Sequence, residues 1–256
     1  HNRPLGINPK LFVRYYFRFM LKYYNTHMFA CGTEAGDWLY GKKNRDKVIV
    51  MNNAIDARQY AYNPDIAKKV RKELGLGNEK VIGHVGRFFP QKNHSFLIDI
   101  FKTIHEKEPD TVLVLVGGGE KDDALKNQIK EKTDRLGLTG YVKFLGVRED
   151  VERIMQSFDV FLLPSLFEGL PVTIIEAQAA GLPCVISDKV PIQCDITGNV
   201  DVVALNDSTE KWAEVVLDKA YNFTKSDTYN KIADAGFDVK KQAKWLENFY
   251  KEALIK

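Results

Sequence analysis

The sequence predicts an α/β fold in which a parallel sheet is covered by helices on both faces. Two observations carry this prediction. Short apolar runs alternate with helical stretches along most of the 256 residues, and glycine or proline stands at many boundaries between them. Short runs that are apolar throughout are typical of strands buried on both faces of a parallel sheet. Right-handed crossovers through the helices then join such strands into one sheet.

The amino-terminal stretch predicts a small set of elements outside this alternation. Helices are expected over residues 9–24 and 33–40, with a strand over residues 26–31 between them. Thr33 is expected to cap the second helix, because a threonine hydroxyl at that position accepts a hydrogen bond from a free N–H of the first turn.

The remaining residues predict a repeated order of strand and helix. The expected strands are residues 81–86, 114–116, 142–146, 160–163, 184–187 and 201–204. The expected helices are residues 95–105, 172–180, 209–221 and 239–254, of which the last is amphipathic. In such a sheet the loops that follow the strands gather at the carboxyl edge, where open α/β sheets bind ligands.

Two carboxylates flank the start of the expected helix at residues 172–180. Glu168 lies in the loop before this helix, and Glu176 lies inside it. The free N–H groups and the dipole of the first turn, residues 172–174, suit a phosphate or diphosphate. Glu176 can then accept two hydrogen bonds from a vicinal diol such as a ribose, and Glu168 can meet hydroxyls of the group attached to the diphosphate. Taken alone, the two residues are equally consistent with surface glutamates.

Two cations follow the expected strand at residues 81–86. Arg87 and Lys92 lie in the loop between that strand and its helix, close to the helix start. An arginine fork and a lysine point charge there would neutralise a diphosphate and stabilise it as a leaving group. The glycines at 117–119 let the backbone approach a ligand closely, and the loop at 147–150 can face a base with backbone groups.

The order and spacing of these motifs resemble the carboxyl-terminal, donor-binding domain of the retaining glycosyltransferases of family 4, which have the GT-B fold. The family's Glu-x7-Glu pattern is matched by Glu168 and Glu176, and its Arg-x4-Lys pattern by Arg87 and Lys92. The Gly-Gly-Gly-Glu and Phe-Leu-Gly segments stand in the expected places, and the match covers roughly residues 45–250. The resemblance implies a Rossmann-like parallel sheet, the carboxyl-terminal half of a GT-B enzyme.

The resemblance implies a site for a nucleoside diphosphate sugar, with a UDP-sugar as the expected donor. It gives Arg87, Lys92 and Glu168 catalytic roles: the two cations would bind the diphosphate and Glu168 the transferred sugar, while Glu176 would bind the ribose. The residues implied to contact the donor are Gly86, Arg87, Lys92, Gly118, Val147, Glu168, Gly169, Leu170, Pro171, Val172 and Glu176. No metal or other cofactor is implied, because these cations and a helix dipole would replace a metal ion.

The resemblance also predicts the organisation of the chain. Residues 1–57 would be a remnant of an amino-terminal acceptor domain with its linker, residues 58–236 the donor-binding domain, and residues 237–256 a helix crossing back towards the first domain. We therefore expect a fragment that is inactive alone and whose last helix is poorly anchored or packed on a neighbouring molecule. His1 falls roughly where the family has an acceptor-side histidine, although a terminal residue is more often a cloning or truncation remnant.

The intact enzyme is expected to be a retaining, hexosyl-type transferase acting on a glycan or lipid-linked acceptor. Its Phe-Glu-Gly-Leu-Pro loop, residues 167–171, is similar to that of members that build bacterial surface polysaccharides. A nucleotide-sugar 2-epimerase of the same fold is one alternative, and it would need acid/base carboxylates and histidines in the missing domain. A non-catalytic nucleotide-sugar-binding partner subunit is another, which the intact site residues disfavour.

The first expected helix carries a basic stripe. Lys10, Arg14, Arg18 and Lys22 recur every four residues among aromatic and aliphatic side chains, and no acidic residue precedes Glu34. This pattern is typical of an interfacial membrane helix, and it would suit a lipid-linked acceptor on the anionic inner leaflet. A core helix of the missing domain is the slightly favoured interpretation, because globular helices are far more common than interfacial ones.

Global composition is that of an ordinary globular protein, with 45% hydrophobic and 28% charged residues. The net charge of +3 is too small to predict nucleic-acid binding. Cys31, Cys184 and Cys194 are odd in number and lack a Cys-x-x-Cys spacing, which indicates neither a zinc site nor a disulfide framework. His84 is expected to be structural rather than catalytic. With no long apolar run and no signal-peptide pattern, we expect a cytoplasmic protein that can be peripheral on the inner face of the cell membrane.

Overall fold

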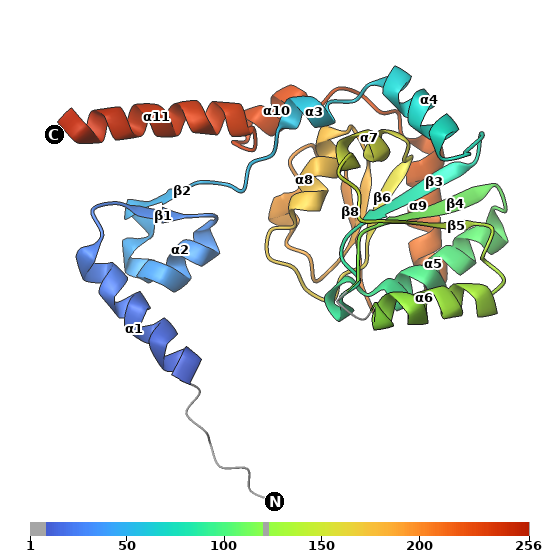
Figure 1. Cartoon of the computed structure of the whole chain (residues 1–256), viewed down its shortest axis with the longest axis horizontal. Helices are drawn as coiled ribbons and strands as arrows, with labels where there is room; N and C mark the ends of the chain where they lie inside the picture. The colour runs from blue at the N-terminus through green and yellow to red at the C-terminus, as the bar shows by residue number, and fades with distance from the viewer. Residues whose placement is uncertain (1–8, 120–122, 256) are drawn as a thin grey trace, which may run out of the picture. The chain divides into compact units, whose positions relative to one another are not determined.

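The structure is a computed structural model that describes residues 9–119 and 123–255 (Figure 1). The chain divides into two compact units between Asn53 and Ala54. The unit up to Asn53 contains a two-stranded sheet, and the unit from Ala54 onwards contains a six-stranded parallel sheet with helices on both faces. The α/β class predicted from the sequence is therefore confirmed.

The smaller unit differs from the prediction at its second helix. Its elements are α1 (Pro9–Tyr24), β1 (Met28–Ala30), α2 (Thr33–Tyr40), the 3-10 helix η1 (Lys42–Lys47) and β2 (Val48–Val50). β1 pairs with β2 in parallel, with Met28 opposite Val48. The prediction that Thr33 caps α2 is wrong: the capping position is Gly32, and no side chain bonds the first turn. Thr33 is already inside the helix, so its hydroxyl does not lie ahead of the free N–H groups.

Helix α1 turns part of its basic stripe towards α2. The guanidinium carbon of Arg14 lies 4.2 Å from the ring centroid of Trp38, and that of Arg18 lies 5.2 Å from it. Aromatic side chains of α1 such as Phe12 and Phe19 remain exposed, at 69% and 57%. The helix therefore contacts α2 through its cations, and its aromatic side faces outward within this unit.

The sheet of the larger unit reverses its direction of growth once. Across the sheet the strands are β5 (Val142–Gly146), β4 (Thr111–Val116), β3 (Lys80–Val85), β6 (Val160–Leu163), β7 (Cys184–Ser187) and β8 (Val200–Val203). All neighbouring pairs are parallel. The chain adds β3, β4 and β5 in one direction, then returns to place β6 beside β3 and continues the other way. This junction of β3 and β6 is the topological switch point, where open α/β sheets bind ligands.

Helices cover the two faces of this sheet (Figure 1). The helices of this unit are α3 (Ala57–Tyr60), α4 (Pro64–Glu73), α5 (His94–Lys107), α6 (Ala124–Arg135), α7 (Val151–Gln156), α8 (Val172–Ala179), α9 (Thr209–Asn222), α10 (Tyr229–Asp234) and α11 (Val239–Ile255), with the short 3-10 helices η2 (Pro90–Lys92) and η3 (Ile192–Cys194). Of these, α5, α8, α9 and α11 were expected from the sequence, and their bounds agree to within a few residues.

The hydrophobic core has one cluster on each face of the sheet. In β4, Val112, Val114 and Val116 pack into the cluster that includes α7 and α8, whereas Leu113 and Leu115 pack into the cluster with α5 and α9. This division follows from the two-residue period of a strand, which sends successive side chains to opposite faces. Every residue of β4 is buried, as the uniformly apolar run predicts.

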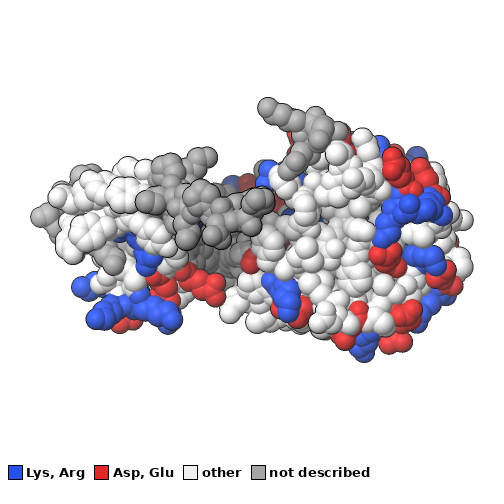
Figure 2. All heavy atoms as spheres, turned by 90° about the horizontal axis from the view of Figure 1, so that it is seen from below, with Lys and Arg blue, Asp and Glu red and all other residues white. Residues whose placement is uncertain are grey.

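Helix α11 is fixed at its start and exposed along much of its length. The N–H of Ile55 donates to the carbonyl of Phe237 at 2.9 Å, and the N–H of Val239 donates to the carbonyl of Ile55 at 2.9 Å. Further along, Trp245 and Tyr250 are 46% and 56% exposed. No helix within the described residues is long and apolar enough to cross a membrane. Figure 2 shows basic and acidic side chains interspersed on one face of the larger unit rather than gathered by sign.

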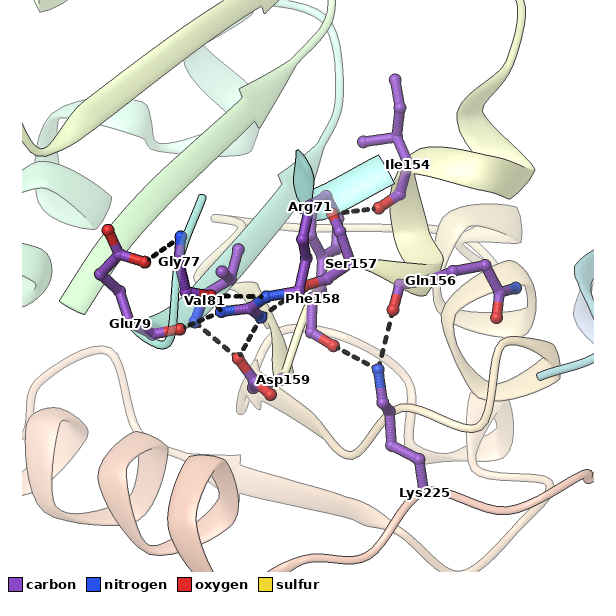
Figure 3. A network of polar contacts seen from close by, with 10 residues as sticks. All are labelled: Arg71, Gly77, Glu79, Val81, Ile154, Gln156, Ser157, Phe158, Asp159 and Lys225. Carbon is purple, nitrogen blue, oxygen red and sulfur yellow. Dashed lines mark hydrogen bonds and ion pairs between the residues drawn. The ribbon is translucent and has the colours of Figure 1, made fainter. Parts of the chain in front are cut away.

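Arg71 is the centre of a polar network beneath the amino ends of β3 and β6 (Figure 3). It lies in the last turn of α4 and donates to the carbonyls of Gly77, Glu79 and Ser157, with Nη2 2.9 Å from the oxygen of Gly77 and Nη1 3.1 Å from that of Ser157. Nη1 also lies 3.2 Å from the carboxylate of Asp159. One side chain therefore ties α4 and the turn before β3 to the turn before β6.

Lys225 extends this network on the other side of the α7–β6 turn (Figure 3). Its Nζ donates to the carbonyl oxygens of Gln156 and Phe158, each at 2.8 Å. Burial lowers the pKa of Lys225 to about 8. The network lies at the edge of the sheet opposite the carboxyl ends of the strands, so we assign it a structural role.

Candidate active site

The pairing of β3 with β6 brings the two predicted loops together. Ile82 pairs with Val160 and Gly83 pairs with Phe161 in parallel register. The loop after β3, which holds Arg87 and Lys92, therefore leaves the sheet beside the loop after β6, which holds Glu168. Neighbouring parallel strands end at the same edge of a sheet, so residues far apart in sequence become neighbours here.

Hydrogen bonds fasten these two loops to each other. The N–H of Leu166 donates to the carbonyl of Gln91 at 2.8 Å. Nδ2 of Asn93 donates to the carbonyl of Pro164 at 3.1 Å. Asn93 has a positive φ of 56°, a conformation that asparagine tolerates better than most residues. The loops behave as one unit, which fixes the cation and carboxylate side chains relative to each other.

Glu168 accepts hydrogen bonds from three side chains. Its Oε1 lies 2.7 Å from Nζ of Lys92 and 2.8 Å from Oγ of Ser165. Its Oε2 accepts from Nε2 of Gln91 at 2.9 Å. The Glu168 side chain is only 7% exposed, and the opposite charge of Lys92 offsets the cost of burying its carboxylate. Gln91 and Ser165 were missed in the sequence, since neither residue type signals a role, and the position of Gln91 directly before Lys92 was the available hint.

Arg87 stands apart from this cluster. Its guanidinium carbon lies 4.6 Å from the ring centroid of Phe89, and its side chain is exposed. Among the described residues it forms no ion pair or hydrogen bond with Lys92 or Glu168, so Arg87 shares the loop of Lys92 but not its ion pair. An exposed guanidinium in this loop can bind two oxygens of a phosphate group through two parallel hydrogen bonds.

The glycines of the predicted site let three loops meet closely. Gly117 has φ of 147°, and a Cβ there would lie 2.0 Å from the carbonyl oxygen of Gly86. Its N–H donates to the carbonyl of Gly146 at 2.8 Å. A Cβ on Gly118 would lie 2.7 Å from Cγ2 of Val147, which is itself 79% exposed. The structure thus gathers Gly86, Gly118 and Val147 at the carboxyl edge.

The amino end of α8 opens onto the same edge. Pro171 occupies the capping position and has no side chain to bond the first turn. Within the described residues, the N–H groups of Val172 and Thr173 donate to no protein acceptor, so they remain available to an anion. The prediction that residue 174 also offers a free N–H is wrong, because Ile174 donates to the carbonyl of Pro171 at 3.1 Å.

The residues around the start of α8 differ in how far they are exposed to solvent. Gly169 is exposed, Leu170 and Val172 are half-buried against the core beneath α8, and Pro171 is buried. The apolar members therefore shape and anchor the loop, and the exposed backbone at Gly169 is what a ligand can reach.

Glu176 lies inside α8 and is held by a residue that the sequence did not reveal. The hydroxyl of Tyr60, in α3, donates to Oε1 of Glu176 at 2.9 Å. Burial raises the pKa of Glu176, and the Tyr60 hydrogen bond opposes that rise. Burial and the Glu176 carboxylate together raise the pKa of Tyr60, so its hydroxyl stays protonated and remains a donor.

His84 and His94 form a buried pair beneath the Lys92 loop. Nδ1 of His84 lies 2.8 Å from the carbonyl oxygen of Leu162, and the two imidazole centroids are 4.8 Å apart. His94 also stacks on Phe88, with ring centroids 4.1 Å apart. Burial lowers the pKa of His84 to about 4 and that of His94 to about 2. Neutral, fully enclosed rings such as these fit the structural interpretation of His84.

The pair predicts acid sensitivity of the fold. An exposed histidine in the unfolded chain binds its proton near pH 6.5, so the unfolded state takes up more protons between pH 6.5 and 4. Stability should be fully present above pH 6.5 and fall as the pH drops. Between pH 7 and pH 5 the wild-type protein should lose unfolding free energy, and His94→Phe should reduce that loss by about 1–2 kcal/mol. Urea unfolding at the two pH values measures the difference. An equal loss in the variant and the wild-type protein would show that His94 is not responsible.

The groups at this edge of the sheet indicate which kind of ligand the site can bind. Cations, free N–H groups of a helix start and two carboxylates meet at the switch point of a parallel sheet. These groups suit a diphosphate that carries hydroxyl-rich groups on both sides, which is the chemistry of a nucleotide sugar. Within the described residues, no group of three His, Cys, Asp or Glu side chains is placed to hold a metal ion. The structure is therefore that of an α/β protein with a candidate site for a ligand of this kind.

The family follows from sequence comparison. Residues 66–228 match the family model described as glycosyl transferases group 1, and the chain belongs to that family. The EpsF protein of Bacillus subtilis, which is named as a glycosyltransferase, is 36% identical over 231 residues, 88% of this chain and 59% of that protein. The UDP-Gal:alpha-D-GlcNAc-diphosphoundecaprenol alpha-1,3-galactosyltransferase of Escherichia coli is 35% identical over 219 residues, 82% of this chain and 55% of that protein. The chain thus spans little more than half the length of these relatives.

Solved structures share the fold. Anabaena Alr3699/HepE in complex with UDP has a TM-score of 0.76 and 22% identity, covering 96% of this chain and 70% of that chain. Sucrose-phosphate synthase of Thermosynechococcus elongatus has a TM-score of 0.76 and 18% identity, covering 96% and 62%. These neighbours have the GT-B fold, which confirms the predicted Rossmann-like half of such an enzyme.

Proposed function

We propose that this chain is the donor-binding part of a retaining glycosyltransferase. It uses a UDP-sugar and passes the sugar to a glycan or lipid-linked acceptor in bacterial surface polysaccharide synthesis. Two relatives support the substrate class. The Escherichia coli enzyme is named for UDP-Gal and a diphosphoundecaprenol acceptor, and the Anabaena neighbour was solved with UDP and with UDP-glucose.

The observation that carries the proposal is the Lys92–Glu168 pair at the switch point, beside the free start of α8. Lys92 faces the diphosphate and Arg87 reaches it from the same loop. As the bond between the anomeric carbon and the diphosphate oxygen breaks, negative charge grows on the leaving group. The two cations and the N–H groups of Val172 and Thr173 stabilise that charge without a metal ion. Glu168 holds hydroxyls of the transferred sugar and Glu176 holds the ribose.

Product analysis tests this function. A full-length protein containing this chain is incubated with UDP-glucose or UDP-galactose and a lipid diphosphate acceptor, and the new linkage is read by proton NMR. Both donors are α-linked, so retention predicts an α-glycoside. A β-glycoside would contradict retention, and a UDP-sugar epimerised at C2 with no glycosylated acceptor would favour the epimerase. Donor binding with neither transfer nor hydrolysis would favour the non-catalytic partner subunit.

We also propose that the protein works in the cytoplasm, in peripheral contact with an anionic membrane through α1. The exposed aromatic side chains of this helix support the proposal, because such side chains enter the interfacial layer of a bilayer. The chain should co-sediment with vesicles of phosphatidylglycerol and phosphatidylcholine, and the double variant Phe12→Asp, Phe19→Asp should co-sediment less. Ile192→Asp, at a 51% exposed position of the other unit, serves as the control. Equal sedimentation of all three proteins would contradict membrane contact through α1.

A further inference from the structure

Tyr60 lies outside the segment that matches the family model, yet its side chain reaches one of the two motif carboxylates. It ends the short helix α3, 116 residues before Glu176 in the sequence, and its hydroxyl donates to Oε1 of Glu176 at 2.9 Å. We propose that Tyr60 is a positioning residue for ribose recognition. It holds one oxygen of Glu176 so that the other faces the ribose diol. This inference rests on the proposed nucleotide-sugar site and adds a residue to it.

The geometry leaves one carboxylate oxygen for a ligand. Within the described residues, Oε2 of Glu176 accepts no hydrogen bond, whereas all the polar contact of this side chain goes through Oε1. Glu168 is different, because both of its oxygens already have protein donors. A carboxylate that is clamped through one oxygen cannot rotate freely, so its second oxygen keeps a fixed direction. Such preorganisation lowers the entropy lost when the diol binds.

Tyr60 is itself fixed by a buried glutamine. Nε2 of Gln156 donates to the carbonyl of Tyr60 at 2.8 Å, and Oε1 of Gln156 accepts from the N–H of Asn63 at 3.0 Å. Gln156 is 1% exposed, and the Tyr60 ring packs against the core cluster beneath α8. The tyrosine therefore has a defined position before any ligand arrives, which a positioning residue needs.

The same contact favours the ionised form of Glu176. Glu176 is surrounded by Tyr60 of α3 and by the charge of Glu152 of α7, and burial is the largest influence on it. Burial and Glu152 both raise the pKa of Glu176, and the Tyr60 hydrogen bond lowers it. An ionised carboxylate accepts hydrogen bonds from both ribose hydroxyls, whereas a protonated one uses an oxygen as a donor. Without the tyrosine hydroxyl, acid should weaken nucleotide binding at a higher pH than in the wild-type protein.

The test compares two nucleotides and three variants by calorimetric titration. UDP and 2′,3′-dideoxy-UDP are titrated into the wild-type chain, Tyr60→Phe, Glu176→Gln and the double variant. We expect Tyr60→Phe to weaken UDP about 5-fold, because the carboxylate that holds the ribose is no longer fixed, and to leave dideoxy-UDP unchanged. In the Glu176→Gln background the tyrosine change should have no further effect. Tyr62→Phe is the matched control, because it removes a neighbouring hydroxyl that does not contact Glu176, and it should bind both nucleotides as the wild-type chain does.

The outcomes separate this inference from the proposed function. If Tyr60→Phe weakens both nucleotides equally, its role is structural and the inference is overturned. Unchanged UDP affinity in Tyr60→Phe overturns it as well. The wild-type titrations test the proposed donor site by themselves. A wild-type chain that binds no UDP, or binds UDP and dideoxy-UDP equally, would contradict that site. The pH dependence of UDP affinity is a second readout. In Tyr60→Phe the affinity should begin to fall at a higher pH on acidification than in the wild-type chain. The same pH in both proteins would contradict the claim that Tyr60 favours the ionised form of Glu176.

Discussion

Lys92→Met is expected to slow sugar transfer by about 10²–10³-fold, the cost of removing one preorganised group that stabilises growing negative charge. The loss should fall mainly on the rate of the chemical step, because the charge of the diphosphate grows as the glycosidic bond breaks. Lys92→Arg should keep part of the activity, since the positive charge remains while the point-charge geometry is lost. Initial rates with saturating UDP-sugar measure the effect.

A second lysine makes a close control. Nζ of Lys132 lies 2.7 Å from the carboxylate of Asp99, and its side chain is 18% exposed, against 17% for Lys92. The pair joins α6 to α5, Nζ also donates to Ser95, and among the described residues Lys132 makes no contact with Glu168. Lys132→Met should therefore leave the transfer rate within about 3-fold of wild type, as expected for a partly exposed ion pair. Equal losses in Lys92→Met and Lys132→Met would show that Lys92 has no special role in the chemistry.

Arg71→Met is expected to lower the free energy of unfolding by about 2–4 kcal/mol, because several carbonyls and the Asp159 carboxylate lose their donor together. Asp159 also accepts from the N–H of Val81 at 2.8 Å, so the change reaches the start of β3. Urea unfolding followed by circular dichroism measures the loss. UDP affinity of the remaining folded protein should be close to wild type, since the network lies at the opposite edge of the sheet.

Arg153 supplies the comparison for Arg71. It also pairs with two acidic residues, Glu73 at 3.0 Å and Asp150 at 3.0 Å, but its side chain is 35% exposed and it bonds no carbonyl group. Surface ion pairs of this kind contribute about 1 kcal/mol or less. A stability loss in Arg71→Met no larger than that in Arg153→Met would contradict the central role assigned to the Arg71 network.

The sequence identified the parts of the fold that are encoded locally. The β6–α8–β7 unit could be predicted because apolar runs are bounded by Gly169, Gly181 and Pro183. Other elements carried weaker patterns: α3, α7 and α10 are only 4 to 6 residues long, too short for a helical period to show. Helix α4 is longer, but it buries only Ala67 and Val70 in an otherwise polar segment, so its apolar stripe is faint.

The site was predictable where charge and spacing identify a residue. Arg87, Lys92, Glu168 and Glu176 stand at spacings that match a motif. The contact between Lys92 and Glu168, however, depends on β3 pairing with β6, and strand order is set by long-range packing that no local pattern records. Tyr60 could not be foreseen for the same reason, because four strands, β3 to β6, lie between it and Glu176 in the sequence.

Nucleotide binding by the 256-residue chain tests the central claim most directly. UDP, GDP and ADP are titrated calorimetrically into the wild-type chain and into Arg87→Ala and Glu176→Ala. The donor site predicts that UDP binds in preference to the others and that each substitution weakens it by about 1–3 kcal/mol, the size of a lost charged hydrogen bond. UDP binding that neither substitution changes would place the nucleotide elsewhere and contradict the site at the carboxyl edge of the sheet.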